Sequence, residues 1–235
     1  ADRIRVLLKN TASGSNYHDR VELVVDGETI QVNSEEMKTG ERRVYQCVAL
    51  TDKILLDYEG NTKEDNAYRG EIECYRTKDG MVIINELPLE EYLYAVVPSE
   101  MPYTYNEEAL KAQAICARSY AYKHMLSNAY AYLGAHVDDS TRFQVYNNSS
   151  EQATTNQAVN DTYGQIMTWN KEPISAFFYS TSCGSGTDAL IWGGSGYDYI
   201  KGRLLTLEDS TLDLTDEKQF KMFIMNNYDT FDREY

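Results

Sequence analysis

One glutamate, Glu100, has the residue type and the surroundings that favour proton transfer. It lies between Pro98 and Pro102, beside Val97 and Met101, and just after an expected short helix. Burial among apolar groups and the negative end of a helix both raise the pKa of a carboxyl. A carboxyl that is protonated near neutral pH can donate its proton to a glycosidic oxygen. On local sequence alone, a glutamate between two helices is more often a surface or capping residue, so both interpretations stand.

The elements that precede Glu100 are expected to be strands. Residues 1–86 alternate apolar and polar side chains with a period of two, and turn residues separate the runs. Strands are predicted at 4–8, 21–25, 29–32, 44–48, 53–56 and 81–85. The polar stretch 59–69 is predicted to be an exposed loop. This part of the chain should therefore be antiparallel β structure.

From Pro88 onward the apolar residues recur at spacings of three and four. This pattern predicts a short helix at 88–97 and a longer, alanine-rich helix from 107 to about 126, capped by Asn106. Because alanine side chains let a helix pack closely, the longer helix is expected in the middle of the domain. Further elements are predicted as a loop and strand at 138–146, a helix at 151–161, a hairpin of strands 165–169 and 175–180, and a helix at 216–226. Together they predict an α+β fold.

The composition excludes some partners. The chain has 235 residues with a formal charge of −15, so polyphosphate backbones and anionic lipid surfaces should be repelled and nucleic acid is excluded as a partner. No apolar run approaches the ~20 residues of a membrane-spanning helix. No leader is visible at the start, so any signal peptide or anchor is expected to have been removed. Tyrosines make up 20 of the 28 aromatic residues, which suits clefts that bind sugars, although most should simply complete the edge of the core.

The four cysteines are widely spaced. Cys47, Cys74, Cys116 and Cys183 form no short Cys-x-x-Cys pair, so the spacing predicts neither a zinc site nor a thioredoxin-like site. Cys47 and Cys74 flank an expected hairpin region and could form a disulfide in an exported protein. The spacing alone does not decide the compartment.

Several motifs resemble those of the stage II sporulation protein D family, also called SpoIID/LytB. The similarity covers roughly 87–190 and is carried by the segments 87–93, 97–102, 108–120 and 139–146, ending near 180–182. The Pro-Ser-Glu-Met-Pro run at 98–102 followed by Ala-Gln-Ala at 112–114 is specific at this spacing. The resemblance implies a mainly β region at 1–86, with room for a small subdomain, and a SpoIID-like catalytic core at 87–235 that the N-terminal strands complete.

The resemblance implies a peptidoglycan lytic transglycosylase, a lyase that cleaves MurNAc-GlcNAc bonds in glycan strands without stem peptides. Glu100 would protonate the leaving oxygen, and its carboxylate would then take the proton of the sugar's C6 hydroxyl as that oxygen closes onto C1 to give a 1,6-anhydro end. Because the substrate supplies the nucleophile, the second carboxylate of ordinary glycosidases is not required. No cofactor is expected.

The rest of such a site would stabilise oxocarbenium-like charge and hold N-acetyl groups. Seven residues are predicted to bind substrate: Gln113, Arg118, Gln144, Tyr146, Ser180, Thr181 and Ser182. Each also has a structural interpretation: Gln113 and Arg118 do not share one helix face well, and Arg118 is as readily a member of a buried ion pair. Gln144 and Tyr146 alternate on the presumed strand and would both point to the cleft. The three hydroxyls precede a glycine turn, where such residues often only form the turn.

The chain departs from the family pattern at two places. Relatives carry a Cys and a His around the Asp-Ser-Thr segment, a pair associated with zinc, whereas Asp138 and Arg142 stand there in this chain. No zinc is therefore predicted at this position. Cys183 and Ser185 also interrupt a run of adjacent glycines. His136 lies near this segment, but a loop histidine without an evident partner is interpreted as incidental.

Two other functions compete with the enzyme. The chain could be a non-catalytic wall-binding module that enhances a partner amidase, which would not need Glu100. A cysteine hydrolase that uses Cys183 is disfavoured, because none of the three histidines accompanies an obvious orienting residue. The resemblance further implies an amidase partner that removes stem peptides, and an extracytoplasmic location at the septum or cell wall. Family members are commonly anchored by an N-terminal helix, and in spore formers they act in engulfment during sporulation.

Overall fold

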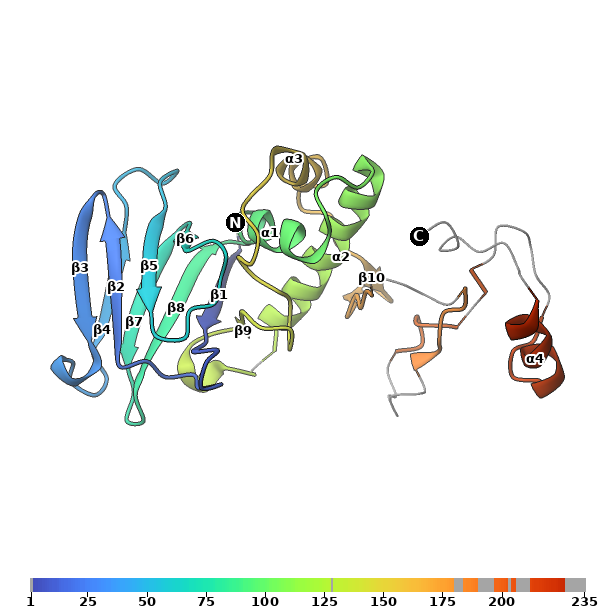
Figure 1. Ribbon diagram of the computed structural model, residues 1–235, viewed down its shortest axis with the longest axis horizontal. Helices are drawn as coiled ribbons and strands as arrows, with labels where there is room; N and C mark the ends of the chain where they lie inside the picture. The colour runs from blue at the N-terminus through green and yellow to red at the C-terminus, as the bar shows by residue number, and fades with distance from the viewer. Residues whose placement is uncertain are drawn as a thin grey trace. The chain divides into compact units, whose positions relative to one another are not determined.

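The computed structural model describes residues 2–127, 129–179, 184–189, 197–202, 204–205 and 212–226. The chain divides into two units, Ala1–Phe177 and Phe178–Tyr235, and each is described by itself. The first unit contains two main sheets and three helices (Figure 1). The predicted division into a β-rich region at 1–86 and a catalytic core at 87–235 stays a prediction.

The larger sheet brings the start of the chain beside the strand that leads into the first helix. Its strand order is β4-β7-β8-β1-β9. The strands are β1 (Arg3–Leu8), β4 (Arg42–Gln46), β7 (Glu71–Arg76), β8 (Met81–Pro88) and β9 (Val137–Asp138). All pairs are antiparallel except β1 with β9. Because β8 ends at Pro88 and helix α1 starts at the next residue, this sheet fixes where α1 begins.

The smaller sheet has the order β3-β2-β5-β6. Its strands are β2 (Arg20–Val25), β3 (Glu28–Asn33), β5 (Ile54–Tyr58) and β6 (Ala67–Tyr68). Asp26 and Gly27 form the tight turn between β2 and β3 with positive φ angles of 51° and 82°, as a two-residue hairpin of this kind requires. In β5 buried and exposed residues alternate strictly, so one face of this sheet is turned to the core.

One hydrophobic core joins both sheets to the helices. It contains buried residues of β2, β7 and β8 together with residues of the first two helices, for example Leu23, Ile72, Ile83, Val96 and Ala117. The helices are α1 (Leu89–Glu100), α2 (Glu107–Met125) and α3 (Ala153–Asp161), and they gather at one end of the sheets (Figure 1). Short 3-10 turns occur at Ser34–Glu36 and Ala131–Leu133.

The long helix α2 occupies the position predicted from its alanines. Ala114, Ala117 and Ala121 are fully buried, and α2 contacts both α1 and α3. Asn106 caps it as predicted, because its side chain accepts a hydrogen bond from the Glu108 N–H. Alanine at these positions allows the three helices to approach one another closely.

The α+β class is confirmed, and the predicted strands and helices of the first unit are largely present. Five details were wrong. Strand β7 was missed, and β6 lies within the stretch predicted as a loop. The predicted hairpin pairs only β10 (Thr168–Trp169) with β11 (Glu172–Pro173), and 175–179 form no strand. Residues 139–146 form turns and extended chain, because β9 ends at Asp138.

The last detail concerns the end of α1. The sequence predicted that Pro98 would stop the helix, but α1 continues through Pro98 to Glu100. Proline removes one helical hydrogen bond, which is tolerated here because packing of Val96 and Val97 in the core holds the helix. Glu100 therefore lies in the last turn of α1, whereas the sequence predicted that it follows the helix.

The second unit contains helix α4 (Glu217–Met225), capped by Asp216, whose side chain accepts a hydrogen bond from Gln219. Three of its apolar side chains, Phe220, Phe223 and Ile224, differ in burial. Of the three, Phe223 is buried, whereas Phe220 and Ile224 are exposed.

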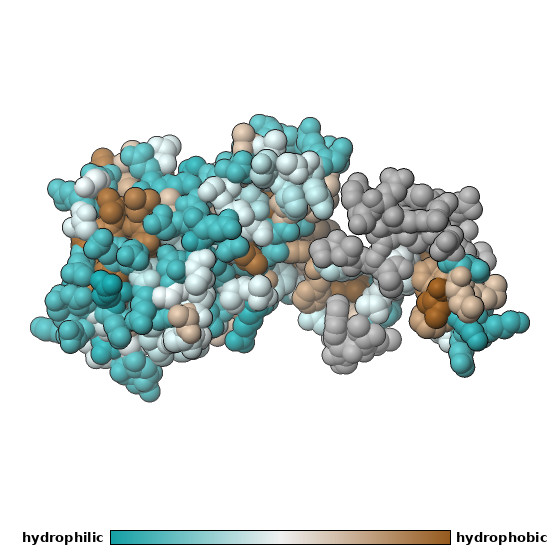
Figure 2. All heavy atoms as spheres, in the orientation of Figure 1, coloured by the Kyte–Doolittle hydropathy of each residue, from teal (hydrophilic) through white to brown (hydrophobic). Residues whose placement is uncertain are grey.

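Hydrophilic side chains cover most of the visible face of the first unit, with a small hydrophobic patch over β2, β3 and β5 (Figure 2). In the described ranges, none of the helices has both the length and the hydrophobicity needed to cross a membrane. Cys47 and Cys74 are buried free thiols, and burial raises the pKa of Cys74 to about 12.

Candidate active site

The carboxyl of Glu100 lies at the C-terminal end of α1 and faces the segment 145–149. Its Oε1 accepts a hydrogen bond from the backbone N–H of Val145 at 2.6 Å. Burial raises the pKa of Glu100 above its ordinary value, and this hydrogen bond opposes part of the rise. Among the described residues, no lysine or arginine forms an ion pair with Glu100. This environment favours the protonated carboxyl, as the sequence predicted.

The neighbouring serine holds the same segment to the helix end. Ser99 Oγ donates to the carbonyl of Ala95 at 2.7 Å and accepts hydrogen bonds from the N–H groups of Asn148 and Ser149 at 3.0 and 3.1 Å. Two consecutive side chains of α1 thus bind three backbone N–H groups of one loop. This arrangement fixes the Glu100 carboxyl in orientation.

Two tyrosines form a buried support below this end of the helix. The ring of Tyr92 stacks on that of Tyr146, with centroids 5.0 Å apart. The Tyr92 hydroxyl donates to Gln144 Oε1 at 3.3 Å, and the Tyr146 hydroxyl donates to Asn85 Oδ1 at 2.6 Å. The pKa of Tyr92 is raised by burial first and then by the nearby Glu100 carboxylate. Tyr92 therefore connects Glu100, Gln144 and Tyr146 in one cluster.

Two of the residues predicted to bind substrate are buried glutamines whose side-chain amide N–H groups lack a described hydrogen-bond partner. The side chains of Gln113 and Gln144 are almost fully buried. Within the part of the chain that the structure describes, their Nε2 atoms have no hydrogen-bond partner. Because an unpaired buried donor is costly, such groups usually serve a ligand or an ordered water.

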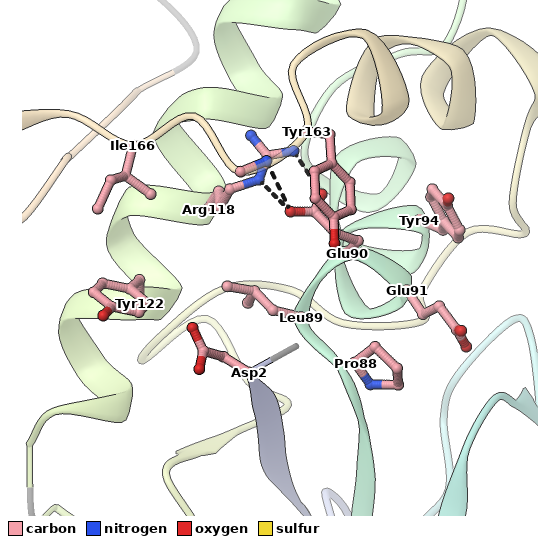
Figure 3. Close-up of a pocket in the computed structure, with 11 residues that line it drawn as sticks. Asp2, Pro88, Leu89, Glu90, Glu91, Tyr94, Arg118, Tyr122, Tyr163 and Ile166 are labelled. Carbon is pink, nitrogen blue, oxygen red and sulfur yellow. Dashed lines mark hydrogen bonds and ion pairs between the residues drawn. The ribbon is translucent and has the colours of Figure 1, made fainter.

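Arg118 belongs to α2, and its side chain contacts the start of α1, at the end opposite to Glu100. Its guanidinium is 1% exposed and pairs with Glu90 through two contacts, Nε to Oε1 at 2.9 Å and Nη2 to Oε2 at 2.7 Å (Figure 3). It also donates to the carbonyls of Val159 and Gln165 at 3.1 and 3.2 Å. The sequence left substrate binding and a buried ion pair open for Arg118, and the structure has the ion pair.

The structure thus brings together only some of the seven predicted binding residues. Gln144 and Tyr146 join Glu100, although they lie on extended chain and not on a strand, and both side chains are buried. Gln113 lies on α2, and Arg118 anchors the opposite end of α1. Ser180, Thr181 and Ser182 lie outside the described residues, as does Cys183 of the cysteine-hydrolase alternative.

Asp138 and Arg142, where the sequence predicted no zinc, and the nearby His136 have the following surroundings. Asp138 is fully buried and accepts hydrogen bonds from the hydroxyl of Tyr130 at 2.7 Å and from the hydroxyl of Ser140 at 2.6 Å. Arg142 is exposed. His136 accepts the backbone N–H of Arg5 through Nδ1 at 3.0 Å, which gives this histidine a structural role.

Sequence reasoning missed Ser99 and Tyr92. Ser99 lies inside the Pro-Ser-Glu-Met-Pro run, so its position beside Glu100 was a usable signal. Tyr92 gave no such signal, because it fits the apolar pattern of α1, which indicates a core residue. Its contact with Gln144 joins residues 52 positions apart.

The arrangement can transfer a proton. The Val145 N–H donates a hydrogen bond to Oε1 of Glu100, and no described residue donates a hydrogen bond to Oε2. Oε2 is therefore the oxygen that can carry and release a proton. A single carboxyl of this kind suits a reaction in which one group acts first as acid and then as base.

The sequence comparisons agree with the predicted resemblance. Residues 77–169 match the family model SpoIID, described as stage II sporulation protein. This segment contains α1, α2, Glu100 and the loop that binds it.

Three curated proteins illustrate the similarity. The stage II sporulation protein D of Bacillus subtilis (strain 168) is 42% identical over 144 residues, which are 55% of this chain and 41% of that protein. An uncharacterized protein of Brachyspira hyodysenteriae is 34% identical over 188 residues, 77% of this chain and 49% of its own length. The amidase enhancer of Bacillus subtilis (strain 168) is 40% identical over 105 residues, 44% of this chain and 14% of that protein. The chain therefore spans half or less of the length of these relatives, and the resemblance is confirmed for the matched segment.

Proposed function

Because residues 77–169 belong to the SpoIID family of stage II sporulation proteins, we propose that this chain is a peptidoglycan lytic transglycosylase. Its substrate is the glycan strand after removal of the stem peptides, and the bond cleaved is that between MurNAc and GlcNAc. The product carries a 1,6-anhydro end. Glu100 is the proposed catalytic residue.

The proposed reaction uses Glu100 twice. Its protonated Oε2 donates a proton to the glycosidic oxygen, and the bond from that oxygen to C1 breaks. The resulting carboxylate then takes the proton of the C6 hydroxyl, whose oxygen forms the new bond to C1. Glu100 ends the cycle protonated, and no water is consumed.

The observation that carries this proposal is the environment of the Glu100 carboxyl. Burial raises its pKa, and its hydrogen bond comes from the neutral N–H of Val145. A carboxyl that begins as an acid must bind its proton firmly, whereas one beside a permanent cation would be ionised. Gln113 and Gln144, whose buried Nε2 donors lack described partners, are proposed to hold the N-acetyl groups.

The test is product analysis of the purified chain with stem-peptide-free glycan. Mass spectrometry should detect anhydro-ended sugars with the parent chain, and Glu100→Gln should lower the rate by about 10²- to 10⁴-fold. Gln keeps the shape of Glu and can still accept the Val145 N–H. The matched control is Glu35→Gln, an exposed carboxylate on the turn Ser34–Glu36, which should not change the rate. Equal rates for Glu100→Gln and the parent would remove Glu100 from the mechanism.

The pH dependence has a defined direction. The acid must be protonated to start the reaction, so kcat/KM should fall with rising pH as Glu100 ionises. Because its pKa is raised, this fall should occur at higher pH than for an ordinary glutamate. A rate that increases steadily through the same range would contradict the role as acid.

A second function is favoured by the similarity to the amidase enhancer. In that case the chain binds the wall and stimulates a partner amidase without cutting glycan. The discriminating measurement adds a cell-wall amidase to intact peptidoglycan. Stimulation that survives Glu100→Gln, together with no anhydro ends from the parent chain, would select the enhancer.

Partner and location belong to the same proposal. A transglycosylase that needs stripped glycan acts after an amidase, so an amidase is its functional partner. Peptidoglycan lies outside the cytoplasmic membrane, and we propose that the full-length protein works there, anchored through an N-terminal segment, at the septum or cell wall. The name of the Bacillus subtilis relative, stage II sporulation protein D, extends this proposal to sporulation, and the family resemblance extends it to engulfment.

A further inference from the structure

A pocket of about 540 Å³ lies in the first unit at the start of α1. Residues from the beginning of the chain, α1, α2 and the segment 163–166 line it (Figure 3). Glu90 and Glu100 are ten residues apart on α1, so about 15 Å of helix separates the two ends. The pocket is thus distinct from the Glu100 site.

The pocket contains two carboxylates without a direct bonding partner among the described residues. Its charged lining residues are Asp2, Glu90, Glu91 and Arg118, which leaves two negative charges in excess. Glu90 neutralises Arg118. Within the described residues, Asp2 and Glu91 form no ion pair or side-chain hydrogen bond. Arg69 is near enough to Glu91 for an electrostatic interaction, but no direct contact with a described residue occupies the carboxylate oxygens of Asp2 or Glu91, which leaves them accessible to a ligand.

Tyrosine rings form the walls between these charges. Tyr122 lies on the same side of the pocket as Asp2, Tyr94 lies near Glu91, and Tyr163 lies between them over Glu90 (Figure 3). Tyr163 is 64% exposed. The Tyr94 ring already has Arg69 at 5.7 Å, so Tyr122 and Tyr163 are the rings open to a ligand.

Carboxylates and aromatic faces together select a cation. A positive group gains from both the negative charge and the ring faces, whereas an anion is repelled by Asp2 and Glu91. A pyranose ring can in addition lie against a tyrosine face and reach its hydroxyl. The volume exceeds what a single metal ion needs and suits a short saccharide.

We propose that this pocket binds an amino sugar whose amine is free and protonated, with the ammonium at Glu91 or Asp2 and the ring against Tyr163 or Tyr122. This inference rests on the proposed function, because a de-N-acetylated sugar is the cationic unit that a glycan strand can carry. The pocket then holds the strand about one helix length from the point of cleavage. It would direct the enzyme to strands that contain free amines.

The test measures binding to the purified chain by calorimetry with three probes. These are the glucosamine trimer with free amines, the same trimer fully N-acetylated, and trilysine. The glucosamine trimer should bind at least about tenfold more tightly at this pocket than either of the others. The combined change Asp2→Asn with Glu91→Gln should weaken its binding about tenfold, and Tyr163→Ala should weaken it severalfold. Glu35→Gln is the matched control, since it removes one exposed charge elsewhere, and it should leave binding unchanged.

Three outcomes would overturn the inference. They are equal binding of the acetylated trimer at this pocket, equal binding of trilysine, or unchanged binding in the Asp2→Asn and Glu91→Gln variant. Glu100→Gln separates this inference from the proposed function. It should retain binding of the glucosamine trimer while product formation is lost. Binding without any anhydro product from the parent would sink the proposed function alone, and product without selective binding would sink only this pocket.

Discussion

Glu90 and Glu100 lie near opposite ends of helix α1, and their carboxylates have opposite surroundings. Glu90 forms a two-contact ion pair with Arg118, whose guanidinium is 1% exposed. Glu100 receives a backbone N–H from Val145, and burial raises its pKa. The first carboxylate is bound by a cationic partner and serves the fold, whereas the second has no ion-pair partner among the described residues and is left able to bind and release a proton.

The difference comes from what each end contacts and not from the residue type. Arg118 reaches Glu90 from α2 and also binds the carbonyls of Val159 and Gln165, so it joins α1, α2 and the end of α3. At the other end, a loop supplies only N–H groups to Ser99 and Glu100. The cationic partner Arg118 gives Glu90 a structural role. The neutral N–H partner of Glu100 leaves that carboxyl free to take part in proton transfer.

The largest effect is expected from a change to the Glu90–Arg118 ion pair near the start of α1. Arg118→Met should lower the free energy of unfolding by about 3–5 kcal/mol, because Glu90, whose side chain is 15% exposed, would be left as a mostly buried charge without its partner. Urea unfolding followed by circular dichroism measures this. The double variant Glu90→Gln with Arg118→Met should recover part of the loss, since neither charge then remains. If Arg118→Met lowered the free energy of unfolding by less than about 1 kcal/mol, the Arg118–Glu90 pair would contribute no more than an ordinary surface ion pair.

An intermediate effect is expected in the support below Glu100. Tyr146→Phe should lower the free energy of unfolding by about 1–3 kcal/mol, because Asn85 Oδ1 loses the donor of its 2.6 Å hydrogen bond in a buried place. The same urea experiment applies. Tyr132→Phe is the control, since that side chain is 66% exposed, and should leave stability unchanged. Equal stabilities of the two variants would mean that the Tyr146 hydroxyl is not needed.

The smallest expected effect concerns Glu100 itself. Its pKa is raised in the folded protein, so its contribution to stability is complete below its ordinary pKa and is lost as pH rises through the folded value. Glu100→Gln cannot ionise and should therefore melt higher than the parent at pH 7, on the order of 2 °C. At pH 4 the difference should shrink. A variant that melts lower than the parent at pH 7 would show that the ionised carboxylate is favoured by the fold.

Much of the fold followed from local patterns. Alternating residues indicated most strands of both sheets, although not β6 and β7, and the spacing of apolar residues indicated α1, α2 and α3. Asn106 was recognisable as a cap because it is followed by acidic residues at the positive end of a helix. The boundaries were less certain: the end of α1 was misjudged at Pro98, since core packing outweighs one missing hydrogen bond.

The sequence by itself determined the fold class, the family resemblance and Glu100 as the candidate acid, because each depends on residues near one another in the chain. Only the tertiary structure decided that Arg118 pairs with Glu90, that Tyr92 supports Gln144, and that a tyrosine-lined pocket opens at the start of α1. These contacts join residues 28 and 52 positions apart. Residues so far apart in the sequence come into contact only when the elements pack together. No local pattern of residue types therefore predicts these contacts.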